Sequence, residues 1–134
     1  RIPISSVDWT PLPPEPVYAG DPVSKLIRLH ADHTVPDFPV VDADGDYIGM
    51  VTGQDIRLAL IDREAIPLLL VAEIMRADLP TVSRGEVLSE VMDKFSSHDV
   101  ATLCIVDDAS EGEPRGLVSR ASVMRRYQRA LLES

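Results

Sequence analysis

Residues 49–52, Gly-Met-Val-Thr, recur as Gly-Leu-Val-Ser at residues 116–119. Ahead of the first stretch stands Phe-Pro-Val-Val-Asp at residues 38–42, and ahead of the second stands Leu-Cys-Ile-Val-Asp at residues 103–107. Short, almost wholly apolar runs bounded by polar residues are typical of buried strands. Two such runs that return in the same order indicate an internal repeat, and a repeat decides the architecture before any single element does.

An amphipathic helix precedes the two strands in each copy. In the first copy, Val23, Leu26, Ile27 and His30 follow the i, i+3, i+4, i+7 spacing of one helix face. Residues 86–98 carry the same pattern in the second copy. The repeat therefore includes this helix as well as the strands.

A hairpin turn and a second helix complete each copy. Residues 44–45 are Asp-Gly, which is a strong hairpin signal between two strands. Residues 54–64 predict the closing helix of the first copy, with Ile56, Leu60 and Ile61 on its inner face. Each copy therefore has the predicted order strand, helix, strand, strand, helix.

We expect an α+β fold made of two such β-α-β-β-α units. Residues 1–9 are expected to form a lead-in, residues 10–66 the first unit and residues 67–134 the second. Units of about 60 residues are too small to be comfortably stable alone, so we expect the two to pack sheet to sheet with pseudo-two-fold symmetry. The apolar face of the last helix is expected to hold Val123, Met124, Tyr127 and Leu131.

The composition excludes several classes of function. Lys and Arg number 13 against 22 Asp and Glu, and a net charge of −9 argues against a large nucleic-acid interface. The sequence has no recognisable catalytic motif and no metal-ligand spacing, so we expect neither an enzyme nor a metal site. The single cysteine, Cys104, lies in an apolar run and is expected to be a buried hydrophobe. No apolar stretch approaches the roughly 20 residues that span a bilayer, so we expect a soluble domain.

The repeated motifs resemble those of a tandem pair of CBS domains, also called a Bateman module, over nearly the whole chain. In the first copy they are residues 38–42 and 49–55, and in the second they are residues 71–75 and 79–82. The resemblance implies a regulatory module that has no catalytic activity and requires no cofactor. It implies an adenine nucleotide (AMP, ADP or ATP) as the regulatory ligand, bound between the two units, and a homodimer as the assembly.

The resemblance places the nucleotide site on the Gly-h-h-Thr-x-x-Asp segment, where h is apolar. Thr52 stands at a helix start, and its hydroxyl beside free backbone amides suits a phosphate. Asp55 lies one turn later and can accept both ribose hydroxyls, although an acid at a helix start also simply favours the helix dipole. The residues expected to flank the adenine from the other unit are Thr81, Val82, Val100 and Ala101.

The second copy departs from this pattern. Ser119 keeps the hydroxyl, but Ser122 stands where the first copy has Asp55. A serine is a weaker partner than a carboxylate for a ribose diol. We therefore expect a weak or empty second site, at which Tyr18 is a candidate to stack on a base.

The two ends of the chain suggest a parent protein. Residues 12–14 and 125–132 resemble segments of CBS pairs at the cytosolic end of bacterial ClC-type chloride channels. This implies a transmembrane channel domain in the same chain, and a module on the cytoplasmic side of the cell membrane that controls a voltage-gated chloride channel or transporter. Two alternatives stay open: a ligand-free constitutive dimerisation scaffold, and a free-standing CBS sensor that acts on a separate enzyme.

Overall fold

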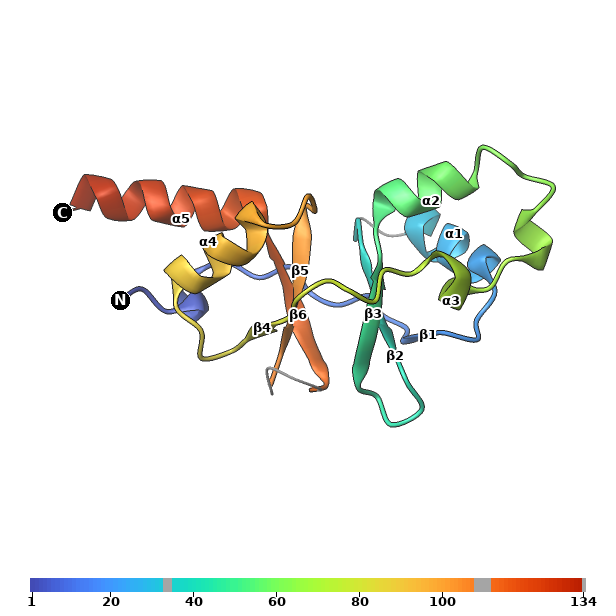
Figure 1. The fold of residues 1–134 in the computed structure, drawn as a ribbon, viewed down its shortest axis with the longest axis horizontal. Coiled ribbons are helices and arrows are strands. Elements are labelled where there is room, and N and C mark those ends of the chain that lie inside the picture. Colours follow the sequence, from blue (N-terminus) through green and yellow to red (C-terminus); the bar gives the residue numbers. More distant parts are fainter. Residues whose placement is uncertain (33–34, 108–111, 134) are drawn as a thin grey trace. The chain divides into compact units, whose positions relative to one another are not determined.

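The computed structural model describes residues 1–32, 35–107 and 112–133, which form two compact units. The first unit is Leu12–Leu79, and the second unit combines Arg1–Pro11 with Pro80–Ser134. Each unit has one three-stranded sheet with helices beside it (Figure 1). The predicted α+β fold of two β-α-β-β-α units is confirmed.

The first unit follows the predicted order of elements. Its sheet has the order β1-β2-β3, with β1 parallel to β2 and β2 antiparallel to β3. Gly45 has φ +86° in the hairpin between β2 and β3, a conformation that glycine adopts without strain. The elements are β1 (Val17–Tyr18), α1 (Val23–Asp32), β2 (Phe38–Val41), β3 (Tyr47–Val51), α2 (Gly53–Ala59), the 3-10 helix η2 (Ile66–Leu68) and α3 (Val71–Ile74).

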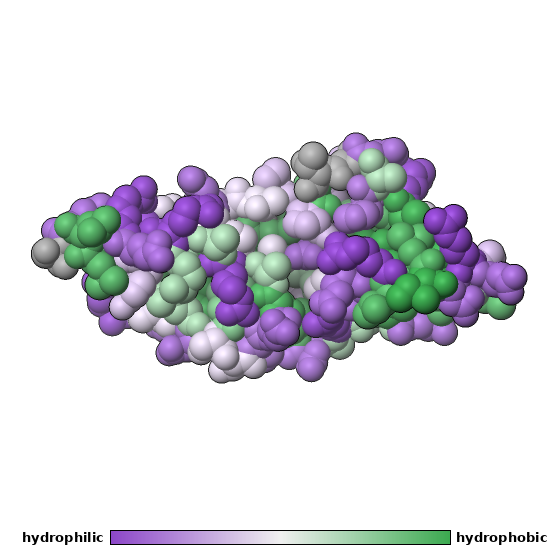
Figure 2. Space-filling view, turned by 90° about the horizontal axis from the view of Figure 1, so that it is seen from above, coloured by the Kyte–Doolittle hydropathy of each residue, from purple (hydrophilic) through white to green (hydrophobic). Residues whose placement is uncertain are grey.

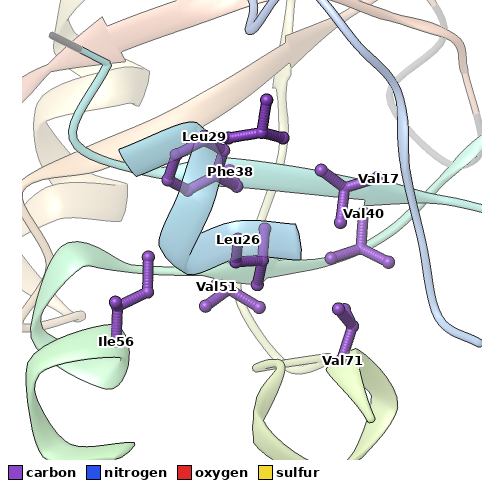
Figure 3. Packing of buried hydrophobic residues seen from close by; sticks show 8 residues of the cluster. All are labelled: Val17, Leu26, Leu29, Phe38, Val40, Val51, Ile56 and Val71. Carbon is purple, nitrogen blue, oxygen red and sulfur yellow. The ribbon is translucent and has the colours of Figure 1, made fainter. Parts of the chain in front are cut away.

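The core of the first unit lies between its sheet and its helices. The inner face of α1 supplies Leu26 and Leu29, which pack towards strand residues such as Phe38 (Figure 3). The side chains of this cluster are almost entirely removed from solvent, and burial of each is worth about 1.5–3 kcal/mol. The cluster is Val17, Leu26, Leu29, Phe38, Val40, Val51, Ile56 and Val71.

The closing helix of the first unit is shorter than predicted. It ends at Ala59, and Leu60 is its C-cap residue. The next amide, that of Ile61, bonds to the carbonyl of Leu58, which tightens the last turn. Ile61 is consequently 79% exposed, and its predicted place on the inner face is wrong.

The second unit repeats the same topology. Its sheet has the order β4-β5-β6, with one parallel and one antiparallel pair, as in the first unit. The elements are the 3-10 helix η1 (Ile4–Ser6), β4 (Val82–Ser83), α4 (Leu88–Ser96), β5 (Thr102–Val106), β6 (Pro114–Ser119) and α5 (Arg120–Glu133).

The long helix α5 is mostly exposed. Val123 is buried, but Met124, Tyr127 and Leu131 are between 38% and 56% exposed. The later turns of α5 have left the sheet, and hydrophobic surface gathers at the C-terminal end of this helix (Figures 1 and 2). Of the four residues predicted on the apolar face of this helix, only Val123 is therefore buried.

The unit boundaries differ from the predicted ones because residues 1–11 pack with the second unit. Ile4 is fully buried there, and its amide donates to the Glu86 carbonyl at 2.9 Å. Thr10 pairs with Leu117 on β6 through two backbone hydrogen bonds of 2.8 and 2.9 Å. Residues 1–11 are thus part of a folded unit, not a lead-in outside it.

Residues 69–79 play the same part in the first unit. The Val71 amide donates to the Asp21 carbonyl at 2.8 Å, and Arg76 pairs with Met50 on β3 through two backbone hydrogen bonds. Each unit is therefore completed by the segment that precedes the other copy in sequence, which is why the predicted boundary after residue 66 falls too early.

Candidate functional site

The start of α2 positions the two residues that the sequence singles out. Thr52 is the N-cap, and its Oγ1 accepts a hydrogen bond from the Asp55 amide at 3.2 Å. In return, the Asp55 carboxylate accepts one from the Thr52 amide at 3.0 Å. This reciprocal pair is a capping box, which satisfies two amides that the helix itself leaves without acceptors. The Thr-x-x-Asp spacing thus has a structural role whether or not a ligand binds.

The Asp55 carboxylate also forms an ion pair with Arg76. Nη2 of Arg76 lies 2.9 Å from Oδ1, and Nε lies 3.3 and 3.2 Å from the two carboxylate oxygens. The Asp55 side chain is 13% exposed and that of Arg76 is 32% exposed, so the pair is partly screened from water. Burial by itself raises the pKa of Asp55, but the hydrogen bonds from Arg76 and Thr52 outweigh it and hold the pKa below its usual value.

A second acid supports the same helix start. Asp37 is 4% exposed, and its carboxylate accepts a hydrogen bond from the Gly53 amide at 2.8 Å. Gly53 lies so close to the backbone that a Cβ there would meet the Pro36 carbonyl oxygen at 2.8 Å. The start of α2 is therefore held by two carboxylates, which accept hydrogen bonds from the Thr52 and Gly53 amides.

The second copy forms the equivalent turn with two hydroxyls in place of the hydroxyl and carboxylate of the first copy. Ser119 Oγ accepts from the Ser122 amide at 3.0 Å and donates to Ser122 Oγ at 2.9 Å, so the Ser119 hydroxyl satisfies one amide at the start of α5. Arg120, which stands where the first copy has Gly53, binds the His98 and Val100 carbonyls through its guanidinium. The start of α5 thus lacks a carboxylate, and the guanidinium that lies beside it is bonded to main-chain carbonyls.

The remaining predicted site residues differ in exposure. Val82 is fully buried and Val100 is 7% exposed, so their side chains contribute mainly to the core, whereas Ala101 is exposed. The Thr81 carbonyl accepts a hydrogen bond from Lys94 at 2.7 Å. Tyr18 is 40% exposed, and its ring lies 5.7 Å from the Lys25 ammonium.

The structure brings the predicted residues together within each unit. Thr52 and Asp55 form one contact group in the first unit, and Ser119 and Ser122 form another in the second. The residues expected to flank the adenine of the main site all belong to the second unit, whereas Tyr18, expected at the second site, belongs to the first.

Arg76, which contacts Asp55, was not among the residues that the sequence singled out. It lies outside the repeated motif, 21 positions after Asp55, and its main chain pairs with Met50 on β3, which brings its side chain to Asp55. A signal was present in the sequence: Arg76 is a lone basic residue between two predicted elements, directly after the Val-Ala-Glu-Ile-Met run.

Residues 5–62 and 71–129 each match the CBS domain family. The chain belongs to this family. Among solved structures it is similar to CBSX2 in complex with AMP, at 18% identity and a TM-score of 0.74, covering 97% of this chain and 98% of that one. It is also similar to the CBS domain pair of protein MJ0100 in complex with 5′-methylthioadenosine and S-adenosyl-L-methionine, at 20% identity and a TM-score of 0.73, covering 95% and 99%.

A membrane protein is also among the structures with this fold. The CBS domain of a CBS domain-containing membrane protein from Sphaerobacter thermophilus has 20% identity and a TM-score of 0.70, covering 93% of this chain and 87% of that one. At this level of identity, these likenesses show the CBS-pair fold. Along the described part of the present chain, no helix is both long and apolar enough to cross a membrane.

Two curated relatives are enzymes by name. L-aspartate semialdehyde sulfurtransferase from Methanocaldococcus jannaschii is 26% identical over 109 residues, and inosine-5′-monophosphate dehydrogenase from Aquifex aeolicus is 29% identical over 105 residues. The matches cover 81% and 78% of this chain but only 21% and 20% of the relatives. The CBS pair thus spans about a fifth of the length of these relatives.

Proposed function

We propose that this CBS pair is a regulatory module that binds an adenine nucleotide, or a related adenosine compound, and has no catalytic role of its own. The observation that carries the proposal is the partly exposed Asp55 carboxylate, held at the start of α2 by the Thr52 capping box. Two similar structures are complexes, one with AMP and the other with 5′-methylthioadenosine and S-adenosyl-L-methionine, which supports this ligand class.

An adenosine ligand at Asp55 shares the carboxylate with Arg76. Arg76 already donates to both oxygens, so a ribose diol either bonds to the lone pairs that remain or displaces the guanidinium. A released guanidinium is suited to pair with a phosphate, because its planar donors match phosphate geometry. Arg76 is therefore placed to favour phosphorylated ligands over the bare nucleoside.

A thermal-shift scan with AMP, ADP, ATP, 5′-methylthioadenosine and S-adenosylmethionine tests the proposal. A ligand at about 100 times its dissociation constant adds roughly 2.7 kcal/mol to the free energy of unfolding. We expect one ligand to shift the melting temperature by several degrees, and D55A to abolish the shift. The comparison variant is R76Q, which breaks the same ion pair but keeps the carboxylate. It should still bind the adenosine compounds without phosphate, and it should bind AMP, ADP and ATP less tightly than the native chain does.

The second copy provides a further control. S122A should barely change the affinity, because Ser122 offers no carboxylate to a ribose. Equal losses in D55A and S122A, measured by calorimetry, would contradict the assignment to Asp55.

A constitutive dimerisation scaffold is the competing function, and one observation favours it. The Asp55 carboxylate already has protein partners from both Arg76 and Thr52, so it needs no ligand to be satisfied. Concentration-dependent light scattering with and without AMP or ATP separates the two functions. A homodimer indifferent to every nucleotide would support the scaffold.

For the parent protein, we propose a ClC-type chloride channel or transporter whose transmembrane domain precedes this module. The support is the resemblance of residues 12–14 and 125–132 to ClC-type tails, which would place the module at the cytoplasmic face of the membrane. The reading frame upstream of Arg1 tests this: a series of hydrophobic spans is expected, and an enzyme domain or a start codon there would refute it.

A further inference from the structure

A basic groove lies in the second unit, whereas Asp55 belongs to the first unit. It has a volume of about 460 Å³, and α5 lines one wall with Arg125, Arg126 and Arg129. Residues 6–8 line the other wall and include the groove's single acid, Asp8. The volume falls within the range of about 300–1,000 Å³ that is usual for small-ligand sites.

The positive charge in this groove is poorly compensated, although the chain as a whole carries a net charge of −9. Arg129 approaches Glu133 only at 3.9 Å, and both side chains are more than 60% exposed. Within the described residues, Arg125 and Arg126 have no acidic partner. Arg125 instead donates to the Ser122 hydroxyl at 3.1 Å, which leaves its charge without a counterion.

Arg126 is the side chain that indicates a ligand. Its Nε donates to the Ser6 hydroxyl at 3.3 Å, which fixes the guanidinium against the N-terminal wall. Its Nη1 is shielded from solvent, yet it has no hydrogen-bond partner among the described residues. A charged donor that is shielded and unpaired is costly, and most such groups in folded proteins have an acceptor. The Arg126 side chain also lines the groove, so a small shift of its guanidinium towards an anion there would give this nitrogen an acceptor.

We propose that this groove binds a small phosphate-bearing anion of the oligophosphate class. Three guanidiniums on one side of a helix present planar forks that match phosphate oxygens better than lysine does. The Ser6 hydroxyl, which lies against the same groove, adds a neutral polar contact. The groove needs no adenine or ribose, so its occupancy is independent of the nucleotide function proposed for Asp55.

Calorimetric titration of the whole chain with inorganic triphosphate, at about 50 mM salt, tests the proposal. We expect one binding event that weakens as salt screens the charges. R126Q should weaken binding by roughly tenfold or more, since it removes a charge-assisted contact. The matched control is R63Q, which removes an exposed arginine of the first unit and should leave the affinity unchanged. D8N should instead tighten binding, because it removes the one repulsive charge.

Three further measurements keep the proposal falsifiable. If R126Q does not fold, the exposed pair R125Q/R129Q replaces it, with the same loss expected. R126K keeps the charge but loses the planar fork, and it should bind less tightly than the native chain. Vesicles containing phosphatidylglycerol test for lipid headgroups as the source of phosphate.

Several results would refute binding of an oligophosphate in this groove. The proposal fails if triphosphate does not bind at millimolar concentration, if R63Q loses as much affinity as R126Q, or if D8N weakens binding. Arginine-dependent binding to vesicles without binding of triphosphate would also overturn it and would assign the groove to a membrane surface.

Discussion

The ion pair between Arg76 and Asp55 gives a stability prediction that can be worked from the structure. Exposed ion pairs contribute about 0.2–1 kcal/mol, whereas removal of one partner from a fully buried pair costs about 3–5 kcal/mol. The side chains of this pair are 32% and 13% exposed and are joined by three contacts of 2.9–3.3 Å. We therefore expect R76Q to lower the free energy of unfolding by about 1–2 kcal/mol.

A double-mutant cycle isolates the pair. D55N keeps an oxygen that can accept the Thr52 amide, so it removes the charge while largely preserving the capping box. Urea denaturation of the native chain, R76Q, D55N and the double variant at pH 7 should give a coupling energy of about 1–2 kcal/mol. A coupling energy below about 0.3 kcal/mol is within the usual error of additivity and would refute the reasoning.

The pH dependence of the same cycle has a definite sign. The pKa of Asp55 is lowered in the folded chain, so its contribution is fully present above the unfolded value of about 3.9. The contribution is lost as the pH falls through the folded value. The coupling energy should therefore be constant between about pH 5 and 8 and should decrease below about pH 4. A coupling energy that grows on acidification would contradict the assignment.

Three further predictions concern packing. I4A should lower the free energy of unfolding, measured by urea denaturation, by about 2–5 kcal/mol because Ile4 is fully buried. The control S5A, at an exposed position, should change it little. Equal effects of the two variants would argue against a folded N-terminal segment. G53A should lower the free energy of unfolding, measured in the same way, by about 1–3 kcal/mol, since the added Cβ would meet the Pro36 carbonyl oxygen at 2.8 Å. An unchanged free energy of unfolding would mean that the backbone here shifts at little cost. Cys104 should resist alkylation at pH 8 until urea unfolds the chain, because its side chain is fully buried and burial raises its pKa to about 12. Rapid labelling of the native protein would contradict this.

The elements whose structure depends on residues close together in sequence could be predicted from the sequence. The hairpin strands β2 and β3 lie where the sequence predicts two strands, since an apolar run, an Asp-Gly turn and a second apolar run are contiguous in sequence. The repeat then placed the equivalent strands of the second copy. The capping residues Thr52 and Asp55 were found for the same reason: a helix start is set by residues three positions apart.

The parts that rest on distant contacts were not predictable from pattern. Nothing periodic marks Ile4 as a core residue, because its burial comes from packing with residues more than 80 positions away. Arg76 lies beside Asp55 because its main chain pairs with Met50 on β3, so no motif spacing relates the two. The exposure of Met124 and Tyr127 had a similar origin: helical spacing indicates an apolar face but not what covers it.

Each unit contains a segment that precedes the other copy in sequence, and this determines which unit bears a force applied to one end of the chain. Residues 1–11 are built into the second unit, so a pull applied at the N-terminus loads β6 through the Thr10–Leu117 bonds and bypasses the first unit. Two peptide crossings, at residues 11–12 and 79–80, join the units covalently. Neither repeat is therefore an independent folding unit, because a cut between the two copies separates each unit from residues that belong to it. A loosened N-terminus weakens the second unit, most of which is distant from it in sequence.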